Sequence, residues 1–423
     1  MKKTLVLLGL ATAFGTAVIA QNTTPIKVSL WVHSSRDTSA EGIAFNGLVK
    51  KFNDSNKNIQ IDLVGLPQGA YNEQIEAAAL ADAMPCVLDF DGPNLYNYVY
   101  TNKLIPIDKY IGAADRADFL PSIIAQGTFN NQLYSLGQFE SGLALWVNRR
   151  VLRFAGIGIP DTLEKAWTGD KFLAVLEHLK KRGRKFPLDM KFNYGQGEWY
   201  TYGFAPVMQS FGGDLINRST YKTASGVLDG KAAVAGMTFF QKMVQYANTN
   251  TKSDLDFIQG KAAISFVGSW AYVDYKKALK DDLALIPMPK FGKKAVTASG
   301  SWNFGISSSC PTPIEAAKVL NYLVSSQSVL TMSNLSGTVP SRQSSIAKSK
   351  NYGPKGELRL YIDQLSTGVS LERPATPAYP VITKAFANAV KQIATGTNPQ
   401  RSLTEAAKTI DADIVANNGY VQK

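Results

Sequence analysis

The chain has few of the side chains that bind transition metals or carry out nucleophilic catalysis. Its 423 residues include two histidines, His33 and His178, and two cysteines, Cys86 and Cys310. Two histidines nearly exclude a multi-histidine metal site, and we expect no metal and no other cofactor. The sequence also lacks a Gly-x-Ser-x-Gly elbow, a Walker loop and a Cys-x-x-Cys pair. It therefore offers no motif for an enzyme of those classes.

Long apolar runs are also absent after the first 20 residues. No later stretch approaches the roughly eighteen uninterrupted apolar residues of a membrane-spanning helix, so we expect a soluble mature chain. The amino terminus has the pattern of a signal peptide over residues 1–20: basic Lys2 and Lys3, an apolar run over 5–19 and a plausible cleavage site at Ala20. No cysteine stands at that site. We therefore predict export without a lipid anchor.

The charge balance is basic, with 45 Lys and Arg against 33 Asp and Glu and a formal net charge of +12. The run Lys180–Lys185 could suggest nucleic-acid binding. It follows apolar residues at helical spacing, Phe172, Leu176 and Leu179, and cations are favourable at the carboxyl end of a helix. We therefore expect no nucleic-acid partner. The excess charge would aid solubility or attract an acidic ligand or partner.

The amino-terminal part has the pattern of alternating strands and helices. Apolar alternation predicts strands at 26–32, 59–64 and 86–90, and helical spacing predicts helices at 38–53 and 71–83 between them. Such a βαβαβ run indicates a parallel sheet with right-handed crossovers. The fold class is therefore α/β.

Local signals predict further features along the chain. Residues 193–204 are rich in glycine and aromatic residues and are expected to form a loop. Thr312–Glu315 and Ser402–Glu405 have the pattern of capping boxes that begin helices.

Two Gly-Ser-Trp corners are the most informative pattern in the chain. The first lies in Phe257–Trp270, where a helix end, a turn at Gly260 and a short apolar strand lead to Trp270. The second, at Ala298–Trp302, precedes another predicted strand. Because ligands bind at the carboxyl ends of strands in open α/β sheets, both rings could face one flat, hydroxylated ligand. The alternative is two core tryptophans.

A series of short motifs then occurs in a fixed order along the mature chain. They are the strand with Trp31, Met84–Val87, Asn130–Tyr134, Ala144–Arg149, Ala155–Gly156, Pro160–Thr162, Phe211–Asp214, Gln259–Ala263, Leu285–Pro289 and Gly337–Arg342. With these motifs the chain resembles the extracellular solute-binding proteins of carbohydrate ABC importers, the maltose-binding-protein-like family.

The resemblance implies a two-lobed periplasmic binding protein fold with discontinuous lobes, a hinge of crossing segments and a central ligand cleft. The crossings are expected near Gln138–Ser141, Met288–Phe291 and Leu335–Pro340. The amino-terminal lobe would comprise 25–139 and 290–336, and the carboxyl-terminal lobe 140–289 and 337–423.

The resemblance also implies a function. A monomeric periplasmic receptor would capture a sugar or short oligosaccharide by lobe closure and deliver it to the permease subunits of an ABC importer. One alternative is the same fold binding a polyamine, a peptide or another non-sugar solute. Another is an exported glycoside hydrolase, for which Asp91 and Glu140 would have to flank the scissile bond. We favour the receptor, which is not an enzyme.

The family's sheet order implies a disulfide. Many relatives have Pro-Asp-Val where this chain has Pro85-Cys86-Val87. In that order the strand returning from the second crossing runs antiparallel beside the third strand. Cys86 begins the third strand and Cys310 follows the returning strand, so we predict a Cys86–Cys310 bond. The alternative is two buried thiols.

The resemblance also indicates which residues would contact the ligand. Trp270 and Trp302 match stacking positions, and aromatic rings suit the C–H faces of sugars while polar groups fix the hydroxyls. Glu140 could instead form a hinge salt bridge, and Arg342 or Arg373 a surface ion pair. Arginines together with His33 would also suit an anionic sugar. The complete predicted set is Trp270, Trp302, Asp91, His33, Ser34, Glu140, Trp199, Glu198, Gly300, Arg342 and Arg373.

Overall fold

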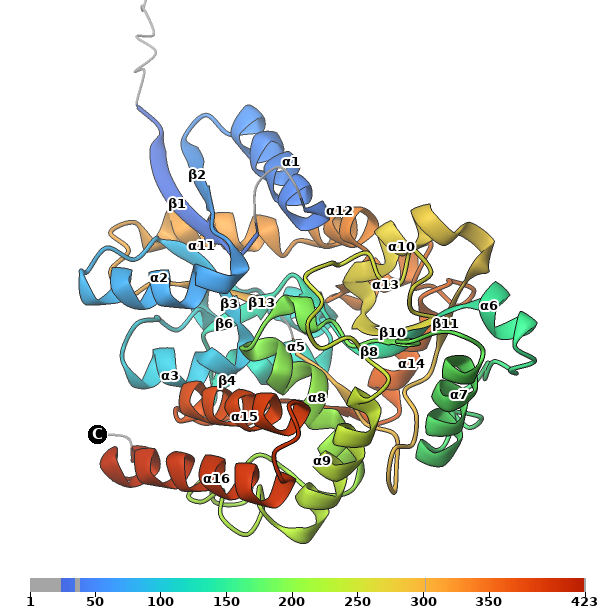
Figure 1. The fold of residues 1–423 in the computed structure, drawn as a ribbon. Helices are drawn as coiled ribbons and strands as arrows, with labels where there is room; N and C mark the ends of the chain where they lie inside the picture. Colours follow the sequence, from blue (N-terminus) through green and yellow to red (C-terminus); the bar gives the residue numbers. More distant parts are fainter. Residues whose placement is uncertain (1–23, 35–38, 301, 422–423) are drawn as a thin grey trace, which may run out of the picture.

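The computed structural model describes residues 24–34, 39–300 and 302–421, and the predicted signal peptide lies outside these ranges. Two separate sheets organise the chain, with helices packed around each of them (Figure 1). The first sheet has the strand order β2-β1-β3-β13-β6 and the second the order β11-β8-β10-β9.

The first sheet begins with the predicted parallel unit. β1 (Ile26–Val32) pairs in parallel with β2 (Ile59–Gly65) and with β3 (Val87–Asp91), while α1 (Ala40–Ser55) and α2 (Gln68–Leu80) form the crossovers. These strands and helices were all predicted, and the parallel pairing is confirmed.

Two later strands complete the first sheet. β13 (Trp302–Ile306) lies antiparallel between β3 and β6 (Ser135–Gly137). A strand from far along the chain therefore sits inside this sheet, not at its edge.

The second sheet is formed by residues between the two parts of the first. β8 (Leu143–Asn148) pairs antiparallel with β10 (Ile264–Gly268) and β11 (Leu283–Ile286), and β10 pairs in parallel with β9 (Leu188–Asp189). Every residue of β8 and β10 is buried, which explains their nearly continuous apolar sequences. The helices whose apolar residues join this core are α7 (Gly169–Lys181), α8 (Glu198–Ser210), α9 (Lys231–Val244), α15 (Tyr379–Ala394) and α16 (Pro399–Ala416).

Short pairings link segments that are distant in sequence. β7 (Phe139–Glu140) pairs antiparallel with β14 (Val339–Pro340), and β12 (Thr297–Ala298) pairs in parallel with β15 (Ser370–Leu371). β7 joins the first sheet to the second along the chain, so β14 lies beside the point where the chain passes between the sheets.

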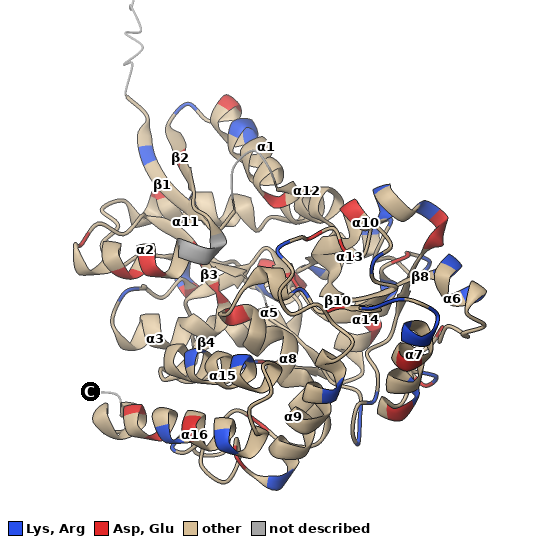
Figure 2. Cartoon of the chain, in the orientation of Figure 1, with Lys and Arg blue, Asp and Glu red and all other residues tan. Residues whose placement is uncertain are grey.

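The remaining elements lie around the two sheets, and Figure 2 shows basic and acidic residues interspersed over helices such as α1, α7, α10 and α16. Within the described residues, no helix combines the length and the apolar character needed to span a bilayer. These elements are α3 (Leu95–Tyr100), β4 (Thr128–Phe129), β5 (Gln132–Leu133), α4 (Ala113–Asp118), α5 (Pro121–Gly127), α6 (Arg149–Phe154), α10 (Tyr272–Leu279), α11 (Pro313–Leu323), α12 (Ser326–Ser336), α13 (Gln343–Lys348) and α14 (Arg359–Ser366).

Several local predictions were wrong. The expected loop 193–204 ends at Gly197, because α8 begins at Glu198 and its aromatic residues enter the second core. α11 begins after Thr312 as predicted, but the Thr312 side chain makes no capping hydrogen bond. Asn398, not Ser402, caps α16. The segment before Gly260 forms turns instead of a helix end, although Gly260 has the predicted positive φ of 73°.

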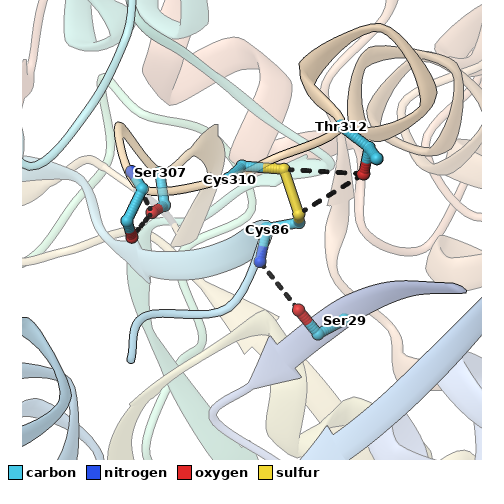
Figure 3. The surroundings of a disulfide bond; sticks show 6 residues. Ser29, Cys86, Ser307, Cys310 and Thr312 are labelled. Atoms are coloured by element: carbon cyan, nitrogen blue, oxygen red, sulfur yellow. Dashed lines mark hydrogen bonds between the residues drawn. A yellow bond between two sulfur atoms is a disulfide. The ribbon is translucent and has the colours of Figure 1, made fainter. Parts of the chain in front are cut away.

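The predicted disulfide is present. The sulfur atoms of Cys86 and Cys310 are 2.04 Å apart and join residues separated by 224 positions (Figure 3). The hydroxyl of Thr312 lies 3.8 Å from the sulfur of Cys86, and the backbone N–H of Cys86 donates to Ser29 Oγ at 2.9 Å. The bond forms where the start of β3 meets the segment after β13, as the antiparallel pairing requires.

Candidate ligand-binding site

Three of the predicted site residues form one ion cluster, in which Arg373 and Asp91 are buried and Glu198 is partly exposed. Arg373 lies in the segment between β15 and α15, and its two terminal nitrogens donate to both carboxylate oxygens of Asp91 at 2.5 and 2.6 Å. Nη1 also donates to Glu198 Oε1 at 2.7 Å. The side chains of Arg373 and Asp91 are only 6% and 7% exposed, so this bidentate pair is shielded from water. Asp91 ends β3 of the first sheet, whereas Glu198 begins α8 beside the second sheet, so the cluster links the two parts of the molecule.

Tyrosine and threonine side chains hold the Glu198 carboxylate of this cluster in place. The Tyr379 hydroxyl donates to Glu198 Oε1, and the Thr383 hydroxyl donates to Glu198 Oε2 at 2.7 Å. Both come from α15. The Arg373 guanidinium also lies 5.0 Å from the ring centre of Tyr202 in α8, a cation–π arrangement. These contacts fix the position of the carboxylate and the guanidinium together.

Glu140 and Gly300 form a second buried group next to the first. Glu140 is fully buried and accepts hydrogen bonds from the backbone N–H groups of Ser141 and Gly300 at 2.9 and 2.8 Å. It also accepts from Ser122 Oγ at 2.6 Å and from Gln126 Nε2 at 3.1 Å. Burial raises the pKa of Glu140, although these four donors oppose the shift. No ion pair of Glu140 occurs in the described part of the chain, where it accepts hydrogen bonds instead. The alternative of a hinge salt bridge is therefore not observed, and ligand contact by Glu140 stays a prediction.

Gly300 has a structural reason to be glycine. Its φ of +113° lies in a region that other residues rarely adopt, and a Cβ there would lie 2.8 Å from Arg373 Nη2. Ser141 joins this group to the ion cluster, because its hydroxyl lies 2.9 Å from the Tyr202 hydroxyl and also donates to the carbonyl of Gly300.

Trp302 stands beside Asp91 on the first sheet, since the two are paired in register between β13 and β3. Its ring is half-buried and stacks on His33, with ring centres 3.6 Å apart and planes 7° apart. His33 in turn lies 2.6 Å from Asp89 and 3.1 Å from Glu41 through its two ring nitrogens. Burial disfavours the charged imidazole, but the two carboxylates outweigh it and raise the pKa of His33 to about 10.

Trp270 belongs to an aromatic group on the second sheet's side. It follows β10, is half-buried, and contacts Trp199 edge-to-face at 6.2 Å and Tyr202 at 6.1 Å. Its indole N–H donates to the Tyr194 hydroxyl at 3.3 Å, and the Trp199 indole donates to the carbonyl of Met190 at 3.2 Å. Tyr202 thus contacts both this aromatic group and the Arg373 guanidinium.

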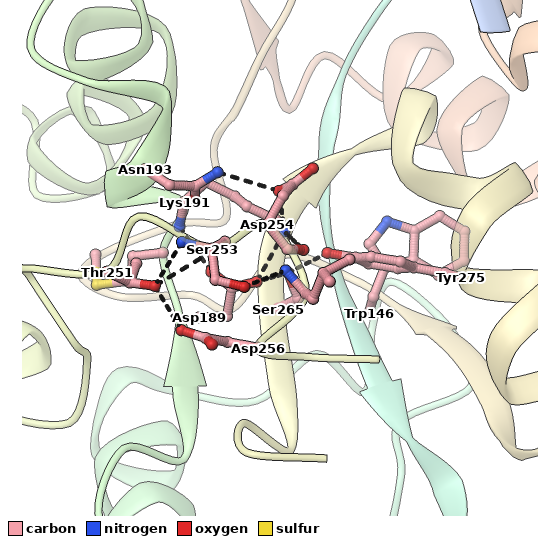
Figure 4. Close-up of polar contacts among 12 residues, drawn as sticks. Trp146, Asp189, Lys191, Asn193, Thr251, Ser253, Asp254, Asp256, Ser265 and Tyr275 are labelled. Atoms are coloured by element: carbon pink, nitrogen blue, oxygen red, sulfur yellow. Dashed lines mark hydrogen bonds and ion pairs between the residues drawn. The ribbon is translucent and has the colours of Figure 1, made fainter. Parts of the chain in front are cut away.

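Lys191 packs next to the aromatic group, and it was not predicted from the sequence as a residue of the site. Its side chain is 1% exposed, and its ammonium lies 3.0 Å from Asp189 and 2.7 Å from Asp254 (Figure 4). The same ammonium lies 5.9 Å from the ring centre of Tyr194, the partner of Trp270. Nothing in the motif pattern indicates that this lysine is buried, because its second partner, Asp254, lies 63 positions away in the sequence.

The structure does not bring Ser34 and Arg342 into contact with the ion cluster. The Ser34 hydroxyl lies 2.5 Å from that of Ser39. The Arg342 guanidinium stacks on Phe119 at 4.0 Å, contacts Asp115 and Asp118 at 3.1 and 3.2 Å, and donates to a backbone carbonyl of α11's carboxyl end. These contacts give Arg342 a structural role, whereas ligand contact by either residue remains a prediction.

A separate cavity of about 380 Å³ lies behind β9. Its lining includes Arg184, Asp189, Asp256 and Lys261, and no described lining residue belongs to the predicted site. The described residues also hold no cluster of three or more His, Cys, Asp or Glu side chains able to bind a metal.

The arrangement can recognise a small ligand with flat apolar faces and many hydroxyls. Half-buried indole rings offer stacking surfaces, and fixed carboxylates and a guanidinium offer hydrogen bonds of defined direction. These groups come from both sheets, which meet at the ion cluster of Asp91, Glu198 and Arg373.

Comparison with known proteins identifies the family. The family model described as bacterial extracellular solute-binding protein matches residues 47–355, more than half of the chain. The chain therefore belongs to the bacterial extracellular solute-binding proteins, a family of exported binding proteins.

Solved structures confirm the predicted two-lobed α/β fold. The GacH receptor of Streptomyces glaucescens, solved unliganded and with acarbose, is similar at a TM-score of 0.79 and 20% identity, covering 94% of this chain and 100% of that one. Lmo0181 of Listeria monocytogenes, solved with cycloalternan, has a TM-score of 0.80 at 14% identity and covers 92% and 99%. The MalE domain of Bdellovibrio bacteriovorus, bound to maltotriose, has a TM-score of 0.77 at 17% identity and covers 92% and 100%.

Proposed function

We propose that this protein is a receptor that captures a sugar or short oligosaccharide between its lobes and delivers it to an ABC importer. The observation that carries the proposal is the pairing of two half-buried tryptophans, Trp270 and Trp302, with the ion cluster of Asp91, Glu198 and Arg373. Aromatic faces together with fixed carboxylates match the two kinds of surface that a sugar presents.

The ligands of the similar structures support a sugar. Acarbose, cycloalternan and maltotriose are bound in the three structures compared above, and all three are carbohydrates. Because identities are 20% or lower, these ligands indicate the class of solute and leave the particular sugar open. The protein releases its ligand unchanged, since capture and delivery need no bond cleavage.

The lobes would move as units around the crossing segments. Phe291 belongs to the core of the second sheet, and Thr297 Oγ1 hydrogen-bonds the backbone of Leu143 in β8. These contacts support a boundary between Ala298 and Trp302 in place of one at residue 290. The first lobe would then comprise 24–139 and 302–336, and the second the rest of the described chain.

The setting is part of the same proposal, and membership of a family of exported binding proteins supports it. The protein works as a monomer in the periplasm, after removal of residues 1–20, and docks on the permease subunits in the inner membrane. Its two lobes close on the ligand only if the closed state binds that ligand better than the open state.

Thermal unfolding of the mature protein with a panel of sugars tests the proposal. A ligand at a hundred times its Kd adds about 2.7 kcal/mol of stability, which raises the Tm by several degrees. Trp270→Ala should abolish the shift, because a half-covered indole supplies roughly 2–3 kcal/mol of binding. Phe154→Ala, at a residue 69% exposed and outside the site, should leave it unchanged. A shift from polyamines or peptides, with none from sugars, would refute a carbohydrate receptor.

A further inference from the structure

We infer that the ligand carries no anionic group and is a neutral sugar or an amino sugar. This inference rests on the proposed function and specifies the charge of the solute. It reverses the expectation that arginines and His33 would favour a uronate or another acidic sugar.

The first step is that the cations of the site are already paired. Both terminal nitrogens of Arg373 bind Asp91, and one of them also binds Glu198. Both ring nitrogens of His33 face carboxylates, those of Asp89 and Glu41. A ligand carboxylate could form a bidentate pair with the terminal nitrogens of Arg373, or an ion pair with His33, only by displacing a buried carboxylate, which would then be left without its partner.

The second step is the excess of acidic groups. Over residues 24–34, 39–300 and 302–421, the ion cluster, the Glu140 group and the contacts of His33 contain two cations, His33 and Arg373. Lys191, next to the aromatic group, is already paired with Asp189 and Asp254. Against His33 and Arg373 stand five carboxylates, which are Glu41, Asp89, Asp91, Glu140 and Glu198. Water is largely excluded here, so an added negative charge would be repelled with little screening.

The third step is what remains for a ligand to bind. A carboxylate can accept about four hydrogen bonds. Glu140 already accepts four, from Ser122, Gln126, Ser141 and Gly300, so it is saturated. Within the described residues, Asp91 accepts two hydrogen bonds, both from Arg373, and keeps capacity for further donors.

The remaining acceptor positions of the Asp91 carboxylate suit ligand donors such as hydroxyl or ammonium groups. The Nε–H of Arg373 is also buried without a partner within the described residues. A neutral hydroxyl or ring oxygen can satisfy this single donor. The site therefore offers carboxylate oxygens that can accept hydrogen bonds from ligand donors, and one N–H that can donate to a neutral ligand oxygen. Both His33 and Arg373 already have carboxylate partners, which an anionic ligand would have to displace.

Matched sugars that differ only in charge test the inference. Calorimetric titration at pH 7 would compare glucose, glucosamine and glucuronate, then cellotriose with a chitosan trimer, and a galactose trimer with a galacturonate trimer of the same linkage. We expect binding in the neutral or amino series and at least about tenfold weaker binding of the corresponding uronate. Glu198→Gln or Asp91→Asn should reduce the difference in affinity between the neutral sugar and its uronate. Glu405→Gln, which removes an exposed surface carboxylate, should leave that difference in affinity unchanged.

The outcomes separate the two proposals. Uronates that bind as tightly as neutral sugars, or more tightly, overturn the inference and leave the sugar receptor standing. If no sugar of any charge binds while another solute does, the proposed function fails, and the inference fails with it.

Discussion

The Asp91–Arg373 pair gives the most direct test of the site's energetics. Arg373→Gln would leave Asp91 and Glu198 buried close together without a compensating charge. Removing one member of a buried ion pair costs about 3–5 kcal/mol, and both side chains of this pair are at most 7% exposed. We therefore expect Arg373→Gln to lower the free energy of unfolding by about that amount. Asp91→Asn should cost less, because Arg373 keeps Glu198 as a partner.

A double-mutant cycle isolates the interaction. The variant carrying both Asp91→Asn and Arg373→Gln should be more stable than the sum of the two single effects by at least about 2 kcal/mol, because the Asp91 carboxylate is then no longer present to be left without its guanidinium. Urea denaturation of the ligand-free protein measures each free energy. Arg401→Gln is the control, since Arg401 and Glu405 form an exposed pair worth less than about 1 kcal/mol. Additive single effects, or a loss below about 1 kcal/mol for Arg373→Gln, would show that the cluster does not stabilise the fold.

Three further predictions concern the disulfide and two titrating groups. Replacing both Cys86 and Cys310 by alanine should lower the free energy of unfolding, measured by urea denaturation, by about 2–5 kcal/mol, because the bond closes a loop of 224 residues. Two reactive thiols in the denatured, unsubstituted protein would contradict the bond. Burial raises the pKa of Glu372 to about 7, so its contribution to stability is present below about pH 4.5 and is lost as the pH rises through 7. Glu372→Gln should remove this loss between pH 5 and 8, and equal pH slopes in both proteins would refute it. The pKa of His33 is raised to about 10, so its stabilisation is complete below about pH 6.5 and is lost as the pH rises through 10; His33→Gln should flatten the decline in Tm over that range, and an unchanged decline would rule His33 out as its source.

Sequence patterns predicted the features that depend on short segments. The strand at Ile26–Val32 and its parallel neighbours follow from alternating apolar residues, and the resemblance to a family placed Cys86 opposite Cys310. Both predictions are confirmed, because strand pairing in this fold depends on register and order, which the motifs preserve.

The partners of the charged residues could not be predicted in the same way. Arg373 binds Asp91 from 282 positions away and Glu198 from 175 positions away, and no local pattern encodes such contacts. Arg342 lies in a recognised motif, yet its guanidinium turns to Asp115 and Asp118 of the first half of the chain. A motif gives the position of a backbone, whereas the direction of a long side chain depends on the charges that happen to surround it.

The central position of β13 has a consequence for how the protein folds during synthesis. β3 and β6 leave a gap that only residues 302–306 can fill, so the first sheet stays incomplete until more than two thirds of the chain has been made. The second sheet, from residues 143–286, is contiguous and has all its strands earlier. We expect it to assemble first, with the amino-terminal strands waiting for their late partner. Formation of the Cys86–Cys310 bond then marks the completion of the first sheet.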